Sequence, residues 1–427
     1  MLIVALGACR TEPGPNEPTY YGQVRPILAA RCAACHSDGG IAPFALTSYE
    51  AVYARRTEIR RALDRRTMPP WPPAPDCNEY ANDRALKPDE RDLLAAWLSA
   101  GAPAGDPADE ASPVEGGGGD RQSFDLVLAM PESYTPRLSP DDYRCFLIDW
   151  PERTPTYVTG LSITPGQTSI VHHVIVYLAQ PEHAAEYAAL DAADPGPGYT
   201  CFGGPVGTRG GGLGGWVPGS LGHAYPDGTG IAVRPGTKVV LQVHYNTPAV
   251  SAKPDRTAVS FSRASTVLRE AVFLPWSDPA WLEPGGMPIP AGAKQVVHTF
   301  AADPTLYFAA TGVPLPFAAG EPVRIHGVAH HQHVLGTRGR IALRRAQGAE
   351  ECLLSIPQWD FHWQGEYFLT TPTVALPGDQ LGLECQWDNS AENQPVVDGV
   401  RQPPRDVEWG DGTTDEMCVA FFYVTGV

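Results

Sequence analysis

The stretch Ser169-Ile170-Val171-His172-His173-Val174-Ile175-Val176-Tyr177-Leu178-Ala179 decides the fold of most of this chain. β-Branched and aromatic side chains dominate it, and these residue types are enriched in strands. Turn residues of the Gly/Pro type lie on both sides of it. It therefore predicts a buried β-strand that carries two adjacent histidines.

Segments of the same kind recur down to the C-terminus. They alternate with Gly/Pro turns, and no long helical period appears among them. They are Thr237–Asn246, Val323–Val334, Arg340–Leu343 and Met417–Val424. About 300 residues of such sequence exceed one small sandwich, so we expect two all-β sandwiches packed side by side.

The N-terminal part shows helical spacing instead. Its apolar residues form three stripes, and the third begins at Pro88 with acidic residues in its first turn. The stripes are Val24, Ile27 and Leu28; Tyr49, Val52, Ile59, Ala62 and Leu63; and Leu93, Leu94, Trp97 and Leu98. We expect a small all-α domain over residues 18–105, followed by a linker rich in Gly, Pro and acidic residues over residues 106–122.

Composition and charge exclude one class of partner. The 427 residues are 43% hydrophobic and 19% charged, as in ordinary globular proteins. The formal net charge is −17. Because binding to nucleic-acid phosphates needs a basic surface, we expect no nucleic-acid partner.

The start of the chain, Met1-Leu-Ile-Val-Ala-Leu-Gly-Ala-Cys9, is a short apolar run that ends in small residues before a cysteine. It resembles the end of a bacterial lipoprotein signal, in which the cysteine becomes lipidated. A disordered leader with a chance cysteine is the alternative. We expect residues 1–17 to be such a leader, and the protein to be exported and anchored by lipid in the periplasm or cell envelope.

The run Cys32-Ala33-Ala34-Cys35-His36 has the C-x-x-C-H pattern of c-type haem attachment. Two thiols one helical turn apart can form thioethers with the two haem vinyl groups, and the next imidazole lies under the iron. A zinc site or a redox-active thiol pair is the alternative for C-x-x-C alone. The adjacent histidine and the exported context favour haem c.

Met68 is the only methionine between Pro18 and Gly105 and lies in a proline-rich segment. A thioether is the sixth ligand expected for an electron-transfer haem, so we predict that Met68 ligates the iron. The alternative is that Met68 packs against the haem without ligating it. Residues 18–105 resemble a class I cytochrome c domain, which implies three helices around one haem.

Nine cysteines fit an exported protein. If Cys9 carries lipid and Cys32 and Cys35 carry haem, six cysteines remain for disulfides. They are Cys77, Cys145, Cys201, Cys352, Cys385 and Cys418. The sequence leaves their fifteen possible pairings open.

Histidines in apolar strands are the other signal of chemistry. His331 and His333 are two residues apart, so on a strand both point the same way and can chelate one ion. His172 and His173 are adjacent, and they reach one metal only at a bulge or a strand end. Each histidine taken singly is more often structural than a ligand. As a set, three imidazoles including His244, and a separate His-x-His with a methionine, suit copper better than zinc.

These motifs, in this order, resemble the copper type II, ascorbate-dependent monooxygenases, the family of peptidylglycine-hydroxylating and dopamine β-monooxygenases. The matching residues are His172-His173, Gln242-Val243-His244-Tyr245, His331-Gln332-His333-Val334-Leu335-Gly336 and Asp415-Glu416-Met417-Cys418. The resemblance implies an electron-storing copper on His172, His173 and His244. It implies a second, oxygen-binding copper on His331, His333 and Met417.

The resemblance also implies a fold of two jelly-roll-like sandwiches, here residues 123–265 and 266–427, with one copper on each. It implies a disulfide onto the cysteine after the ligand methionine, which makes Cys385–Cys418 the preferred pair. Cys145–Cys201 is a second candidate pair.

The chain departs from the peptide-amidating members of the family at the substrate. Those members bind the substrate carboxylate with an arginine and a tyrosine at the positions of Ala329 and Phe421. A glycine-extended peptide is therefore not the expected substrate. The resemblance implies a solvent-filled cleft that the two copper sites face. The aromatic segment Trp359–Gln364 either lines this cleft or packs at a sandwich edge.

The sequence thus predicts a copper-dependent monooxygenase that uses dioxygen to hydroxylate a C–H bond of a small substrate. Electrons would come from ascorbate or another redox protein, and the fused haem would relay them to copper. The alternatives are an exported electron-transfer or copper-handling lipoprotein without catalysis, and a binding module whose copper sites have decayed.

Overall fold

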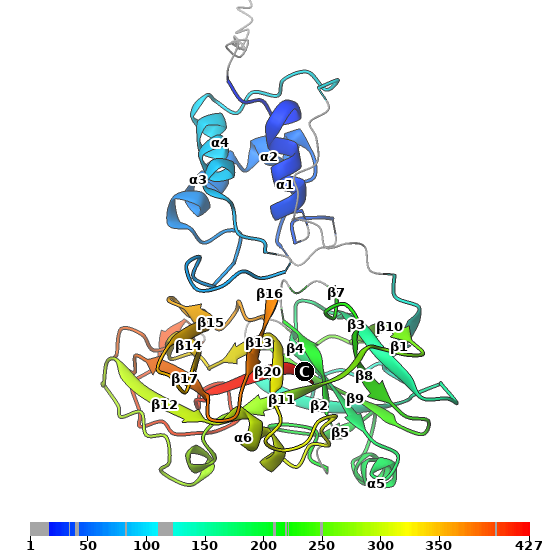
Figure 1. Cartoon of the computed structure of the whole chain (residues 1–427). Helices are drawn as coiled ribbons and strands as arrows, with labels where there is room; N and C mark the ends of the chain where they lie inside the picture. The colour runs from blue at the N-terminus through cyan, green and yellow to red at the C-terminus, as the bar shows by residue number, and fades with distance from the viewer. Residues whose placement is uncertain are drawn as a thin grey trace, which may run out of the picture. The chain divides into compact units, whose positions relative to one another are not determined.

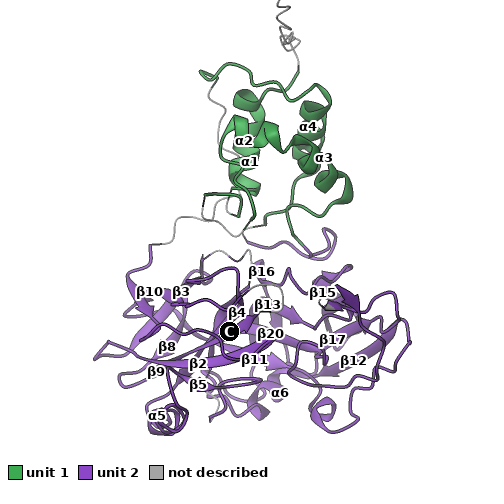
Figure 2. Cartoon of the chain, turned by 180° about the vertical axis from the view of Figure 1, so that it is seen from behind, with its two compact units in different colours: residues 1–71, 82–120 green, residues 72–81, 121–427 purple. Residues whose placement is uncertain are grey.

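The computed structural model describes residues 17–33, 35–38, 42–81, 83–109, 123–207, 211–217, 220, 222–247, 251–397 and 399–427. The expected lipoprotein-type leader with Cys9, and most of the expected linker, lie outside these residues. The chain is mostly β, with a few helices near the N-terminus (Figure 1). It divides into two compact units, residues 1–71 with 82–120 and residues 72–81 with 121–427 (Figure 2). No helix in the described ranges has the length and apolarity to cross a bilayer.

The first unit is helical, as its apolar stripes predicted. Its elements are a π-helical turn at Tyr20–Val24, α1 (Arg25–Arg31), α2 (Tyr49–Ala54), α3 (Arg56–Arg65) and α4 (Pro88–Ser99). The single helix expected over the second stripe is interrupted at Arg55, whose φ of −104° and ψ of 9° are not helical. Buried residues from all three stripes, including Leu28, Val52 and Trp97, form one core. A buried bidentate ion pair between Arg31 and Glu90, with N–O distances of 3.0 and 3.1 Å, joins α1 to α4.

The second unit contains every strand found among the described residues. The first ten are β1 (Leu126–Ala129), β2 (Asp141–Asp149), β3 (Thr156–Thr164), β4 (Val171–Ala179), β5 (Tyr199–Thr200), β6 (Gly212–Trp216), β7 (His223–Ala224), β8 (Thr229–Val233), β9 (Lys238–Asn246) and β10 (Ala258–Ala264). The others are β11 (Arg269–Trp276), β12 (Val296–Ala302), β13 (Val323–His331), β14 (Gly336–Arg344), β15 (Glu350–Ile356), β16 (Glu366–Ala375), β17 (Gln380–Trp387), β18 (Val396–Val397), β19 (Val400–Arg401) and β20 (Val419–Gly426). Two short helices, α5 (Ala184–Ala193) and α6 (Pro304–Ala310), interrupt them where no helix was expected.

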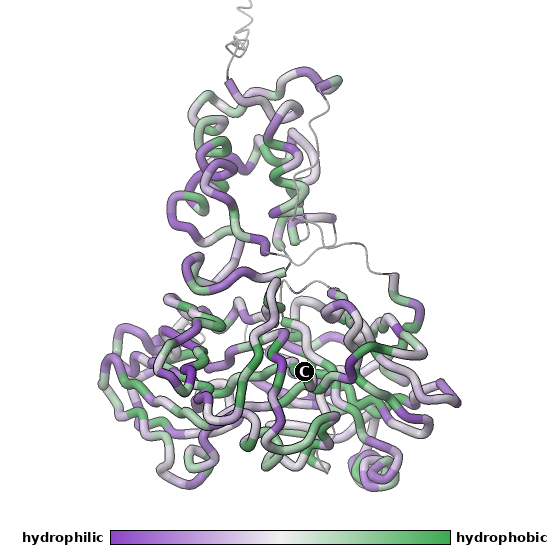
Figure 3. Tube along the Cα trace, in the orientation of Figure 1, coloured by the Kyte–Doolittle hydropathy of each residue, from purple (hydrophilic) through white to green (hydrophobic). Residues whose placement is uncertain are grey.

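The strands pair into one 14-stranded and one four-stranded hydrogen-bonded sheet, with a separate two-stranded β18–β19 ribbon. Within the larger sheet, β2, β9 and β4 are neighbours, and β11, β20 and β13 are neighbours. β11 begins just after the expected boundary at residue 265, yet it pairs with β6 and β8 as well as with β20. The two expected halves are thus joined by strand pairing, which the sequence did not indicate. Hydrophobic segments concentrate in the inner strands (Figure 3).

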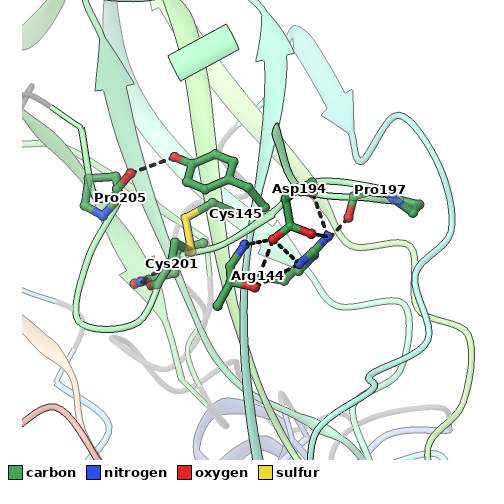
Figure 4. The surroundings of a disulfide bond; sticks show 10 residues. Arg144, Cys145, Asp194, Pro197, Cys201 and Pro205 are labelled. Carbon is green, nitrogen blue, oxygen red and sulfur yellow. Dashed lines mark hydrogen bonds and ion pairs between the residues drawn. A yellow bond between two sulfur atoms is a disulfide. The ribbon is translucent and has the colours of Figure 1, made fainter. Parts of the chain in front are cut away.

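Three disulfides hold the second unit. Cys385–Cys418 and Cys145–Cys201 confirm the two expected pairs. Cys145 lies on β2 next to Arg144, whose guanidinium binds Asp194 and the Pro197 carbonyl (Figure 4). Disulfides of this number are typical of proteins that fold in an oxidising compartment.

The third disulfide, Cys77–Cys352, was not predicted. Cys77 belongs to residues 72–81, which lie within the expected helical domain in sequence but pack with the strands. The backbone N–H of Ala74 donates to the Ser355 carbonyl at 2.8 Å, and the Tyr80 hydroxyl donates to the Leu353 carbonyl at 3.0 Å. These ten residues therefore belong to the β unit.

Candidate metal centres

Three imidazoles converge in the larger sheet. His172 and His173 lie on β4, and His244 lies on the neighbouring strand β9. The Nδ1 atom of His173 is 3.3 Å from Nδ1 of His172 and 3.3 Å from Nδ1 of His244. One ring nitrogen from each residue lies within 4.8 Å of the other two, which suits three ligands of one metal ion. We call these residues the histidine trio.

A β-bulge explains how two adjacent histidines reach one point. In the pairing of β4 with β9, Val171 lies opposite Tyr245 while His173 lies opposite His244, so β4 carries one extra residue between them. That residue is His172. The bulge turns His172 to the same side as His173. The sequence requires a bulge or a strand end for His172 and His173 to reach one metal, and the structure has a bulge at this place.

A carboxylate lies behind the trio. Asp141 Oδ1 accepts hydrogen bonds from His244 Nε2 and from the Asn246 side chain, both at 2.8 Å. The Tyr143 ring stacks on His244 with centroids 4.0 Å apart. With its proton held on Nε2, His244 presents Nδ1 to a metal. Sequence reasoning missed Asp141, because only the pairing of β2 with β9 places it there.

Burial keeps His172 and His173 neutral. Removal from solvent, helped by repulsion from His244, lowers the pKa of His172 to about 3. The same causes hold the pKa of His173 well below its ordinary value. Both imidazoles are therefore uncharged at neutral pH, which is the state that binds metals.

His331 and His333 form a second pair at the end of β13. Their ring centroids are 5.0 Å apart. His331 Nδ1 binds the Gln364 side-chain oxygen at 2.6 Å, and His333 Nδ1 binds the Asp415 backbone carbonyl at 3.0 Å. Because these acceptors hold the proton on Nδ1, Nε2 of each ring is left for a ligand bond. Burial lowers the pKa of both, that of His333 to about 3.

Glu416 ties this pair to the segment that carries Met417. Its buried carboxylate accepts the backbone N–H of His333 at 2.8 Å and that of Leu335 at 2.7 Å. It also accepts the indole N–H of Trp387 at 2.8 Å. Glu416, which contacts His333 directly, precedes Met417 in the sequence. Cys418, which follows Met417, is fixed by its disulfide to Cys385.

The histidines without an expected role have other partners. His326 binds the Thr425 hydroxyl at 3.0 Å, and His330 binds the Gln332 side chain at 2.8 Å. His362 is exposed and pairs with Asp360 at 3.0 Å. These three histidines are therefore hydrogen-bonded side chains.

In the helical unit, Cys32 and Cys35 are free thiols in the turn after α1. The backbone N–H of His36 donates to the Cys32 carbonyl at 2.9 Å, so the motif has one helical turn. His36 Nδ1 binds the Phe44 carbonyl at 3.0 Å, which leaves Nε2 for an iron. Burial raises the pKa of the Cys32 thiol to about 12, which disfavours a reactive thiolate. Met68 lies partly buried in the segment after α3.

Comparison with known proteins bears on the C-terminal part. Residues 307–425 match the family model for the copper type II ascorbate-dependent monooxygenase, C-terminal domain. This match covers less than half of the chain and includes His331, His333 and Met417. The family implies oxidoreductase activity. No curated protein matches the chain.

Among solved structures, the chain aligns with one from work on the Mn(II) centres of Bacillus subtilis oxalate decarboxylase. The alignment covers 68% of this chain and 91% of that chain, at 7% identity and a TM-score of 0.12.

Proposed function

We propose that this protein is a copper-dependent monooxygenase that hydroxylates a C–H bond of a small substrate. The observation that carries the proposal is the convergence of the three imidazoles of the trio. The same sheet contains β13, which ends at His331, the first residue of the second histidine pair. The pair lies in the part that matches the copper monooxygenase family. In this proposal, residues 123–265 and 266–427 are the two jelly-roll-like halves, joined through β11.

The donor atoms fit two copper ions of different character. The trio offers three Nδ1 atoms and would hold an electron-storing copper. His331 and His333 offer Nε2 atoms, and Met417 adds a soft thioether that favours Cu(I), the state that reacts with dioxygen. When bound, the two ions supply the electrons and the oxygen chemistry. The residues around them fix the ligand tautomers, through Asp141, Gln364 and the Asp415 carbonyl.

The substrate would be small and lack a carboxylate anchor at this place. Ala329 and Phe421, which replace the arginine and tyrosine of the peptide-amidating members, lie directly opposite each other in the pairing of β13 with β20. Phe421 is 37% exposed. An apolar, partly open surface at these positions offers no partner for a carboxylate, so a glycine-extended peptide is not the substrate we propose.

The helical unit would carry haem c on Cys32, Cys35 and His36, with Met68 as sixth ligand, in a class I cytochrome c fold. It would relay electrons from ascorbate or another redox protein to copper. We propose export to the periplasm or cell envelope with a lipid anchor on Cys9. Mixing protein with reduced haem and oxidised copper tests the relay, and haem that stays reduced on the turnover timescale would end it.

The test of the main proposal begins with metal content. The full chain should bind two copper ions and one haem. Reaction with ¹⁸O₂ and ascorbate, in the presence of small amines, phenols or aliphatic acids, should place one ¹⁸O atom in an organic product. Copper and haem binding with oxygen uptake but no labelled product would favour a non-catalytic electron-transfer lipoprotein. Failure to bind copper would favour a binding module with decayed sites.

A further inference from the structure

The segment Trp359–Gln364 connects β15 to β16 and contacts the second histidine pair twice. Gln364 accepts from His331 Nδ1 at 2.6 Å, and the Trp359 indole N–H donates to the His333 carbonyl at 3.1 Å. The backbone N–H of Trp359 also donates to the Thr337 carbonyl at 2.9 Å. The segment is therefore fixed to the pair rather than packed at a remote edge of a sheet.

One side chain of this segment contacts both metal centres. The Phe361 ring stacks on His172 of the trio, with centroids 4.7 Å apart and an interplanar angle of 20°. The same ring meets His333 edge to face, with centroids 6.0 Å apart and an angle of 84°. A single aromatic ring thus lies between a ligand of one centre and a ligand of the other.

The position of this ring is set from two sides. The Gln364 side-chain N–H donates to the Phe361 carbonyl at 2.9 Å, while its oxygen binds His331. Gln364 therefore couples the backbone at Phe361 to the second pair. On the other side, the bulge at His172 presents that imidazole to the Phe361 face. Offset stacking and edge-to-face contacts are the favourable arrangements of such rings.

We propose that Phe361 is a positioning residue that couples the two copper centres. This inference rests on the proposed function. The ring fixes the separation of His172 and His333, and it gives one electron a route through packed atoms instead of across water. The transfer forms and breaks no bond. With copper bound at both sites, the electron would leave Cu(I) at the trio, which becomes Cu(II), and would reduce Cu(II) to Cu(I) at the site of His333.

The test compares variants of the full chain that hold two copper ions. Phe361→Leu keeps an apolar side chain without the ring, and Phe361→Tyr keeps the ring. Phe317→Leu, at another partly buried phenylalanine of the same unit, is the matched control. Copper content and the thermal midpoint are measured first, and both should remain close to wild type in all three variants.

The discriminating readout needs no substrate. The copper ions are reduced with ascorbate and mixed with hydrogen peroxide, which takes two electrons and two protons to become two water molecules. Rapid freezing and electron paramagnetic resonance (EPR) then count the Cu(II) formed. Wild type, Phe361→Tyr and Phe317→Leu should reoxidise both ions in one phase. Phe361→Leu should show two phases, the slower at least tenfold slower, with weaker magnetic coupling between the two Cu(II) ions.

A single phase and unchanged coupling in Phe361→Leu would overturn this inference while leaving the proposed function intact. Absence of bound copper in wild type would instead end the proposed function. If Phe361→Leu loses copper, Phe361→Met is judged by the same two measurements, because its flexible apolar side chain fills the space without a ring.

Discussion

Asp141 shows how a residue outside the ligand set controls a candidate metal centre. Its carboxylate binds His244 Nε2 at 2.8 Å, fixes the tautomer and places a negative charge behind the ring. We expect Asp141→Asn to weaken Cu(II) binding at the trio by about 10–100-fold, the usual effect of losing such a partner. Competition with a chelator measures the affinity. Asp149→Asn, on the exposed end of the same strand, is the control. Equal affinities in the two variants would show that the carboxylate has no such role.

His244 itself separates a ligand from a structural histidine. It is 1% exposed and belongs to the trio, whereas His362 is exposed and pairs only locally with Asp360. We expect His244→Ala to retain one copper per chain, because the second pair is untouched, and His362→Ala to retain two. Elemental analysis after dialysis gives the count. Two copper ions in His244→Ala would exclude the trio as a binding site.

At this scale the sequence indicates the ligands but not their supports. Histidines in apolar strands are conspicuous, so His172, His173 and His244 were named from the sequence. Asp141 is an ordinary residue in its local sequence, and the aromatic segment Trp359–Gln364 is conspicuous without indicating what Phe361 and Gln364 contact. Their roles arise from contacts between segments far apart in the chain, and no local pattern encodes such contacts.

Among the elements, β2 shows how the strands near the trio are braced. Arg144 on β2 donates two hydrogen bonds of 2.9 Å to Asp194, at the end of α5 (Figure 4). The same guanidinium also donates hydrogen bonds to three other oxygens. The hydrogen bonds from Arg144 are the largest cause of the low pKa of Asp194, which is about 2. Because the folded-state pKa lies below the ordinary value of 3.8, the stabilisation is present above pH 4. It is lost as the pH falls from about 4 to 2.

We therefore expect Asp194→Asn to destabilise the β unit by about 2 kcal/mol at pH 7, or a few degrees in thermal midpoint. The difference from wild type should shrink below pH 4. Calorimetry between pH 3 and pH 7 measures it. Glu182→Gln, in a half-exposed pair with Arg234, should change little at any pH. A difference that does not depend on pH would contradict the assigned ion pair.

Elements were predicted well where periodicity is strong. The strand of the opening stretch is β4, and the third helical stripe is α4. The second stripe is continuous in sequence, yet the helix breaks at Arg55, because the break depends on backbone geometry that an apolar period does not report. α5 and α6 are short and flanked by strands, so their periods span too few turns to be recognised.

For the whole molecule, the sequence indicated a helical front and a β-rich remainder. It did not indicate that residues 72–81 leave the helical unit and pack with the strands. That segment has neither a helical stripe nor strand alternation, and its place is set by Cys77–Cys352 and by backbone bonds to β15 and β16. A disulfide between cysteines 275 residues apart cannot be predicted from local sequence patterns.

Removing Cys77–Cys352 and removing Cys145–Cys201 should therefore have different effects. Replacing Cys77 and Cys352 by serine frees the 72–81 segment, so amide exchange should accelerate there and around Leu353, with the trio unaffected. Replacing Cys145 and Cys201 acts next to the trio, because Gln242 on β9 binds the Cys201 carbonyl at 2.8 Å. Each change should destabilise by about 2–5 kcal/mol.

Only the second replacement should weaken copper binding at His244, two residues after Gln242. Mass-resolved hydrogen exchange and copper titration of the two double variants measure both effects. Loss of trio copper in the Cys77/Cys352 variant would mean that the 72–81 segment supports the metal centre. In that case the β unit would depend on a piece of chain that lies, in sequence, between the two parts of the helical unit.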